Sequence, residues 1–224
     1  KRKKKKKAGS SQKFTVTHAR IDPSVKEIGR QAFQNCGQLV EVQLSEGLEV
    51  IGYFAFSGTS LERVKFPSNV KEVGEGAFRG CEQLLVVELN EGLERIEAGA
   101  FHGCKSLKQI KTPSTLKKIA AKAFEGCANV EEVVLCEGLE HIGKRAFYGC
   151  KSLKRFKSPS TVKEIGEAAF FGCEQLVEVE LSKGLEHIGR NAFYGCKSLE
   201  RFEVPSTVKV IGSSAFYVAS NWKR

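Results

Sequence analysis

The sequence predicts a repeat solenoid of the mixed α/β class, built from about nine stacked units of 23 residues. Two observations carry this prediction. The dipeptide Ala-Phe recurs at a nearly constant spacing, and an alternating apolar segment follows most copies. We therefore expect parallel, in-register strands on one side of the solenoid and short helical or 3₁₀ turns on the other side.

Phenylalanines define the repeat, because they lie 23 residues apart except for a spacing of 22 between Phe56 and Phe78. A unit of this size cannot bury its own apolar face, whereas stacked units cover one another. At roughly 4.8 Å per strand, nine units predict a body about 40 Å long. The phenylalanines are Phe33, Phe56, Phe78, Phe101, Phe124, Phe147, Phe170, Phe193 and Phe216.

Each unit contains a predicted strand and a predicted turn segment. The pattern L-x-x-V-x-L, as in Leu176, Val179 and Leu181, alternates between inward and outward positions and predicts a strand. The segment Ala-Phe-x-Gly-Cys is too short for a long helix. We expect it to form one or two helical or 3₁₀ turns that end at the glycine.

These strings resemble a known repeat class. The sequence Glu-Gly-Leu-Glu-His-Ile-Gly at 137–143 and Ala-Phe-Tyr-Gly-Cys at 146–150 are similar to BspA-like leucine-rich repeats. The chain departs from the general leucine-rich pattern, because Gly184 and Leu185 stand where an asparagine and a later leucine would follow Leu181. The resemblance implies a right-handed leucine-rich-repeat solenoid that serves protein recognition or adhesion, without catalysis.

The units are of two alternating kinds, so the true period is about 46 residues. Pro-type repeats carry Pro23, Pro67, Pro113, Pro159 and Pro205, and Gly-type repeats carry Gly47, Gly92, Gly138 and Gly184. One charged position alternates in sign through all nine units. We expect these side chains to form a ladder of ion pairs, each worth roughly 0–1 kcal/mol. This charge column consists of Lys26, Glu49, Lys71, Glu94, Lys117, Glu140, Lys163, Glu186 and Lys209.

The outward positions of the L-x-x-V-x-L strands are also charged, and they sum to zero. Six are positive and six are negative. This composition indicates a self-neutralised sheet surface rather than a charged recognition face, and it lacks the positive stripe that nucleic acid requires. The charged members are Glu41, Arg63, Lys65, Glu88, Lys111, Glu132, Arg155, Lys157, Glu178, Glu180, Arg201 and Glu203.

The cysteines have the pattern of core residues. Seven occupy one repeat position, where Thr59 and Ala219 replace them in other units, so we expect small buried side chains. Cys136 lies in a turn and is predicted to be exposed and most reactive. No zinc-like spacing, phosphate loop or nucleophile elbow occurs. We therefore predict no enzymatic activity, no cofactor and no metal site. The seven are Cys36, Cys81, Cys104, Cys127, Cys150, Cys173 and Cys196.

A basic tail precedes the repeats. The chain carries a formal charge of +10, of which seven charges come from the first seven residues, so the remainder carries only +3. Like charges repel and stay solvated, which predicts a disordered segment at residues 1–12 before a solenoid at 13–224. The C-terminal end of the solenoid is expected to be uncapped, because Val218 and Ala219 replace the Gly-Cys of most other units and the chain stops before the next strand. The tail is read as a solvated extension, a nuclear-import signal or an anionic-surface contact. It comprises Lys1, Arg2, Lys3, Lys4, Lys5, Lys6 and Lys7.

One position per repeat, directly after the core phenylalanine, changes character along the chain. It holds Gln34, Ser57, Arg79, His102 and Glu125 in the first five units, and then Tyr148, Phe171, Tyr194 and Tyr217. Charge at this position suggests exposure, so the four aromatic residues, here called the aromatic stripe, form the predicted partner-binding surface. The alternative interpretation is that these rings stack and seal the outer layer.

These observations favour a non-enzymatic scaffold for protein–protein interaction whose partner is another protein. A structural subunit that associates end to end is the first alternative. A nuclear or anionic-surface factor that binds nucleic acid or membrane through the tail is the second. An intracellular location is favoured over the cell surface, and it would be nuclear if the tail acts as an import signal.

Overall fold

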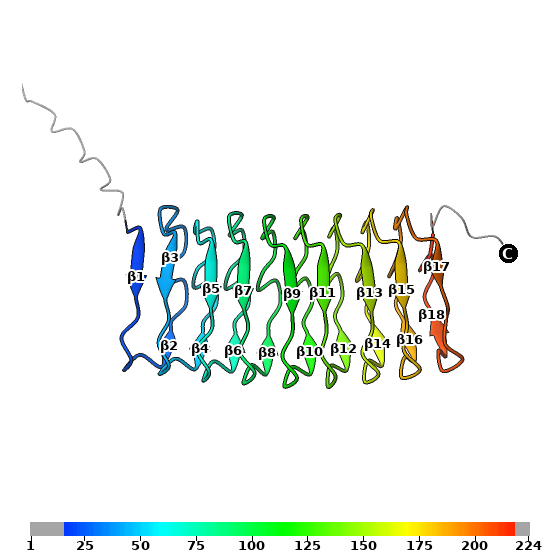
Figure 1. The fold of residues 1–224 in the computed structure, drawn as a ribbon, viewed down its shortest axis with the longest axis horizontal. Helices are drawn as coiled ribbons and strands as arrows, with labels where there is room; N and C mark the ends of the chain where they lie inside the picture. Colours follow the sequence, from blue (N-terminus) through cyan, green and yellow to red (C-terminus); the bar gives the residue numbers. More distant parts are fainter. Residues whose placement is uncertain (1–15, 218–224) are drawn as a thin grey trace, which may run out of the picture.

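The computed structural model describes residues 16–217, and it shows parallel strands stacked along one axis (Figure 1). Each repeat contributes one odd-numbered and one even-numbered strand. The odd strands are β1 (His18–Arg20), β3 (Glu41–Gln43), β5 (Arg63–Lys65), β7 (Val86–Glu88), β9 (Gln109–Lys111), β11 (Glu132–Val134), β13 (Arg155–Lys157), β15 (Glu178–Glu180) and β17 (Arg201–Phe202). The even strands are β2 (Glu27–Ile28), β4 (Val50–Ile51), β6 (Glu72–Val73), β8 (Arg95–Ile96), β10 (Lys118–Ile119), β12 (His141–Ile142), β14 (Glu164–Ile165), β16 (His187–Ile188) and β18 (Val210–Ile211).

The predicted parallel, in-register arrangement is confirmed. The even strands form one nine-stranded sheet in which each strand pairs with its counterpart in the next repeat, as Ile119 pairs with Ile142. The odd strands are divided into three sheets, ordered β1-β3-β5-β7, β9-β11 and β13-β15-β17. The two sides of the solenoid therefore differ in continuity.

The prediction of helical or 3₁₀ turns around the phenylalanine is wrong, because residues 16–217 contain no helix. The residue two positions before each core phenylalanine has a positive φ, between 51° and 61°, and a left-handed residue interrupts a right-handed helical turn. The backbone N–H groups instead alternate in direction. Phe33 donates to Ala55 in the next repeat at 2.7 Å, whereas Gln34 donates to Gln31 within its own repeat at 3.1 Å. This segment is thus a third hydrogen-bonded layer between repeats.

The core phenylalanines form one continuous stack inside the solenoid. Successive ring centroids lie 5.1–5.5 Å apart, with ring planes within 15° of parallel. Rings from Phe56 to Phe193 are at most 2% exposed. Because every ring has a ring of the next repeat on its face, the core propagates without a gap through the described residues.

The repeat cysteines line the same core. Six of them are buried, and each Sγ lies 3.1–3.5 Å from a phenylalanine carbonyl oxygen of the preceding repeat. Burial raises the pKa of the Cys127 and Cys196 thiols to about 12, so these thiols remain protonated and unreactive. Cys36 is half-buried. Cys136 is also half-buried rather than exposed, because it lies against Thr112 of the preceding repeat.

The junctions between repeats are of two kinds, and they alternate. We call a junction tight where a Pro-type repeat precedes a Gly-type repeat, and loose where the order is reversed. All four tight junctions pair three residues of each odd strand, whereas the loose junctions pair two, one or none. The N–H···O bond that enters each odd strand is 2.8–2.9 Å long at tight junctions and 3.2–3.5 Å at loose ones.

The proline position accompanies the alternation, and at two tight junctions it shows a hydrogen bond that a proline could not make. At the position that proline occupies, Cys136 and Ser182 of Gly-type repeats donate their backbone N–H to a hydroxyl of the preceding repeat, at 3.1 and 2.8 Å. Pro159, in a Pro-type repeat, has no N–H and cannot make this backward bond. Each Pro-type repeat therefore bonds well to the repeat that follows it and less well to the one before it.

Side chains partly compensate at the loose junctions. The Glu137 carboxylate accepts hydrogen bonds from the backbone N–H and the hydroxyl of Ser160 in the next repeat, and Glu46 does the same for Ser68. These bonds hold the pKa of both carboxyl groups below the usual value. The equivalent residue at the last loose junction is Lys183, which cannot accept them.

Candidate functional site

The four residues of the aromatic stripe lie together on one face. Their rings stack in sequence, with centroids 4.8 Å apart between Tyr148 and Phe171, 4.7 Å between Phe171 and Tyr194, and 5.1 Å between Tyr194 and Tyr217. This second stack runs parallel to the core stack because each ring follows a core phenylalanine directly in sequence. A contiguous aromatic surface therefore spans four repeats.

The stripe is only partly open to solvent. Tyr217 is 58% exposed, and the other three rings are half-buried. The guanidinium of Arg145 lies 4.2 Å from the centroid of Tyr148 and covers its free face. Since Phe171 and Tyr194 have a neighbouring ring on each face, solvent reaches these two rings at their edges.

The sequence argument that charge at the stripe position requires exposure does not hold at Glu125. This residue is 8% exposed, and its Oε1 lies 2.7 Å from Nη2 of Arg145. Ser57 at the equivalent position is also buried. An ion pair thus allows charge in this layer, and the case for the stripe depends on the exposed ring edges instead.

The odd-strand face is charged and internally paired. Nζ of Lys157 lies 2.7 Å from Oε2 of Glu180, and Nε of Arg155 lies 3.7 Å from Oε2 of Glu178. Since neighbouring strands carry opposite charges, most of the face is neutralised by contacts along the solenoid axis. This geometry supports the self-neutralised interpretation.

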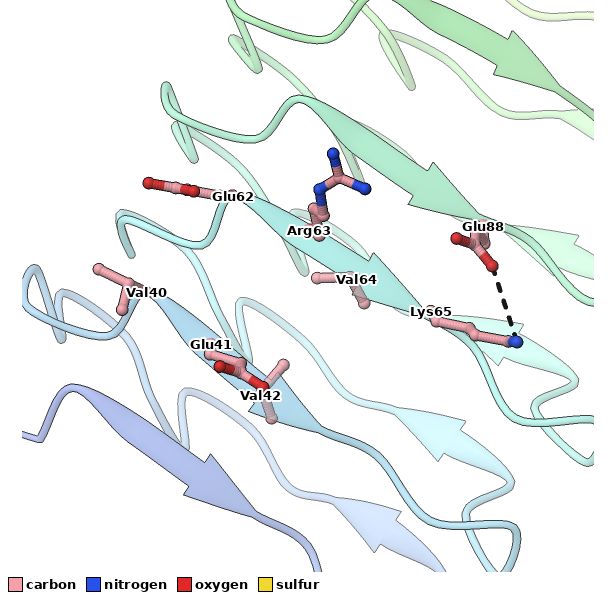
Figure 2. Close-up of a pocket in the computed structure, with 8 residues that line it drawn as sticks. All are labelled: Val40, Glu41, Val42, Glu62, Arg63, Val64, Lys65 and Glu88. Carbon is pink, nitrogen blue, oxygen red and sulfur yellow. Dashed lines mark ion pairs between the residues drawn. The ribbon is translucent and has the colours of Figure 1, made fainter.

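Two hollows on this face coincide with loose junctions. The larger, of 560 Å³, lies between β3 and β5, and Figure 2 shows Lys65 at its rim reaching toward Glu88, with Val42 on β3 and Val64 on β5. The other, of 330 Å³, lies between β15 and β17. Both hollows lie beside incompletely paired odd strands, and their rims carry both signs of charge.

The charge column lies beside the even strands as expected, but it forms few ion pairs. Seven of its members donate a backbone N–H to the carbonyl of the preceding member at 2.8–2.9 Å. Within the described range, ion pairs join Lys26 to Glu49 at 3.6 Å and Glu186 to Lys209 at 2.5 Å. The backbone, more than the charges, therefore holds this column in register.

A hollow that the sequence analysis missed lies on the turn side. It measures 330 Å³ and is lined by Phe54, Arg79, His102 and Lys122 around Gly76 and Gly99. Seven other repeats carry a side chain at the position of these two glycines, which was the available signal. Burial lowers the pKa of His102, so this side chain is biased toward its neutral form.

Groups that could hold a metal ion are absent from residues 16–217, where no three His, Cys, Asp or Glu side chains cluster suitably. His141 contacts Glu164 of the next repeat, with Nδ1 and Oε2 3.5 Å apart. The same residues include no helix of the length and apolarity that crossing a membrane requires. The tail Lys1–Lys7 lies outside the described range.

The repeat pattern matches a family model. The model for the BspA type leucine rich repeat region matches residues 10–131 and 94–223, which together span most of the sequence. The chain belongs to this family. Leucine-rich repeat proteins of this family and fold are typically non-enzymatic, and they generally mediate protein interaction or act as scaffolds.

Solved structures of two bacterial leucine-rich repeat proteins resemble this one. The leucine-rich repeat protein of T. pallidum is 30% identical, with a TM-score of 0.65 over 83% of this chain and 79% of that one. A leucine rich cell surface protein from Faecalibacterium prausnitzii A2-165 is 25% identical, with a TM-score of 0.59 over 92% of this chain and 58% of that one. A comparison with curated protein sequences gave no match.

Proposed function

We propose that this chain is an interaction scaffold that binds another protein through the aromatic stripe of Tyr148, Phe171, Tyr194 and Tyr217. The observation that carries the proposal is the row of stacked rings whose edges remain in solvent over four repeats. Aromatic residues, and Tyr in particular, are enriched at the energetic centres of protein interfaces.

The stack also lowers the cost of binding. Each ring is held by its neighbours before a partner arrives, so little side-chain entropy is lost when the interface forms. The scaffold beneath is held at every junction by the even-strand sheet and by the hydrogen-bonded turn layer around the core phenylalanines. A preformed surface of this kind suits recognition better than catalysis, which would require a group of reactive side chains.

A peptide-display selection on the immobilised full-length protein tests the proposal. We expect enriched peptides that lose binding to a triple variant carrying Tyr148→Ser, Phe171→Arg and Tyr194→Glu, the residue types that occupy this position in earlier repeats as Ser57, Arg79 and Glu125. Thermal denaturation of the variant is the control. If stability falls steeply while selected peptides still bind, the rings serve packing and the assignment is wrong.

End-to-end association is a second candidate, favoured by the last described strand. Val210 and Ile211 in β18 are 52% and 51% exposed. Residues 218–224 follow in sequence and lie outside the described range, so the uncapped end stays a prediction. Sedimentation at tens of micromolar tests this alternative, and a monomer over the whole concentration range would contradict it.

Binding to nucleic acid or anionic lipid is the remaining alternative, and we attribute it to the tail. Residues 8–224 carry only +3, and the odd-strand face is self-neutralised. Deleting Lys1–Lys7 should therefore abolish any such binding at low salt. Undiminished affinity of the deletion variant for DNA or anionic vesicles would contradict this assignment.

A further inference from the structure

The exposed parts of the aromatic stripe favour an anionic partner. The edge of an aromatic ring is the positive end of its quadrupole, and a phenol O–H donates a hydrogen bond. Phe171 and Tyr194 offer edges because both of their faces are covered. Tyr148 is covered by another ring on one face and by the Arg145 guanidinium on the other. The surface thus presents partial positive charge along its length.

Charged side chains on both sides of the stripe also favour an anionic partner. In each repeat, two sets of residues flank the stripe ring in sequence. One set lies three to four residues before the ring, the other lies three residues after it, and each set forms a row from repeat to repeat. In the four stripe repeats these rows hold five cations and two carboxylates, a net charge of +3, of which the ion pair between Arg145 and Glu125 leaves +2. They are Lys144, Arg145, Lys151, Glu167, Glu174, Arg190 and Lys197.

The two carboxylates are saturated by the surrounding cations. Glu174 contacts Nζ of both Lys151 and Lys197 at 3.3 Å, and Lys144 contacts Glu167 at 2.9 Å. The bond from Lys144 and the positive charges of Lys144, Arg190 and Arg145 lower the pKa of Glu167. The remaining positive potential therefore belongs to the surface as a whole, whereas the odd-strand face has none.

We infer that the stripe binds an extended acidic segment of a partner protein, in which carboxylates alternate with apolar side chains; this rests on the proposed function. The apolar side chains pack on the ring edges, and the carboxylates lie opposite the flanking cations. A polyphosphate chain fits less well, because it has no apolar groups to pack on the exposed ring edges of Phe171 and Tyr194.

The test measures binding of a short alternating Glu-Leu peptide to the full-length protein, with an alternating Lys-Leu peptide as the counter-probe. The protein is compared with a flank variant, in which Lys151, Arg190 and Lys197 are each changed to Gln. The matched control changes Arg63, Lys111 and Arg155 on the odd-strand face to Gln. Because the basic tail is present in all three proteins, it contributes equally.

We expect the Glu-Leu peptide to bind, and the flank variant to bind it about tenfold more weakly with a shallower salt dependence, as for charges at the rim of an interface. The control should change affinity less than about twofold. Equal losses in both variants, or equal binding of the Lys-Leu peptide, would overturn the inference. So would tighter, flank-dependent binding of single-stranded DNA or anionic vesicles.

The display selection separates this inference from the proposed function. Enriched peptides that depend on the rings and are rich in Asp and Glu support both. Peptides that depend on the rings but lack acidic residues leave the proposed function standing and contradict the acidic partner. A selection that yields no ring-dependent peptide contradicts the proposed function itself.

Discussion

Tight and loose junctions join repeats of nearly the same sequence, yet they differ in how the odd strands pair. At the tight junction between β13 and β15 three residues pair, whereas between β11 and β13 none do. On the opposite side of the solenoid, the even strands pair at every junction. The two faces therefore differ: the loose junctions divide the odd-strand face, whereas the even-strand face stays continuous.

This alternation makes a pair of repeats the structural unit. A Pro-type repeat and the Gly-type repeat after it share the shorter bonds and the full strand pairing. In a stack whose stability is the sum of repeat and junction contributions, weaker junctions are where partial opening begins. We expect the solenoid to open between pairs before it opens within them.

Breaking a tight junction should have the largest effect. A Cβ on Gly184 would lie 2.0 Å from the carbonyl oxygen of Ser160 in the preceding repeat, so the backbone must move. We expect Gly184→Ala to destabilise the protein by roughly 2–3 kcal/mol, measured by urea denaturation. Gly29→Ala is the matched control, because a Cβ there meets nothing within 4 Å. Equal effects of the two substitutions would contradict the contact.

Removing one hydroxyl from a tight junction should have a smaller effect. Thr112 is 1% exposed, and its Oγ1 accepts the backbone N–H of Cys136 at 3.1 Å. Thr112→Val keeps the shape but leaves this N–H unpaired, at a cost of about 1–2 kcal/mol. Thr112→Ser restores the acceptor and is the control. A neutral Val variant would argue against the role of the backward bond.

Acid should weaken the loose junctions selectively. Hydrogen bonds from Ser160 and Ser68 depress the folded-state pKa of Glu137 and Glu46. A carboxyl with a depressed pKa stabilises the fold above its unfolded pKa of about 4.3, and this contribution is lost as pH falls through the lower folded value. Glu137→Gln should therefore flatten the stability profile below about pH 4.3. Thermal melts between about pH 2 and pH 6, the range in which carboxylates titrate, measure this profile. A Glu137→Gln profile identical to that of the unmodified protein would contradict the stabilising role of Glu137.

The smallest predicted difference needs no mutation. The N–H of Lys154 at a loose junction makes a bond of 3.5 Å, whereas that of Val177 at the next tight junction makes one of 2.9 Å. Hydrogen exchange followed by mass spectrometry or NMR should show faster exchange at Lys154 and at Lys108. Indistinguishable protection at Lys154 and Val177 would mean that the two junctions open together.

The sequence was sufficient for the register but not for the local backbone. Because Phe147 and Phe170 are 23 residues apart, like their neighbours, the in-register stack followed from spacing alone. The left-handed conformations of Lys122 and Arg145 leave no mark in the sequence, since these residue types suit a helix equally well, and the helical turns were therefore predicted wrongly. Only Gly76 and Gly99 carried a hint.

The candidate site was also predictable from the sequence only in part. The position of the aromatic stripe could be predicted, because the repeat aligns Tyr148 with Phe171 and the later rings. The burial of Glu125 could not be, since it depends on the side chain of Arg145 one repeat later. The alternation of proline was visible, but its effect on pairing required the direction of each backbone N–H.

The bonds of all three backbone layers run along the solenoid axis, and this orientation determines how the protein would respond to a pull on its two ends. Because the junctions are joined in series, each of them carries the same load, and the layers of a single junction must bear all of it. The weakest junction yields first, so the chain would lengthen in steps. Each released pair of repeats would add roughly 150 Å of extended polypeptide, so the solenoid would behave as an extensible tether under load.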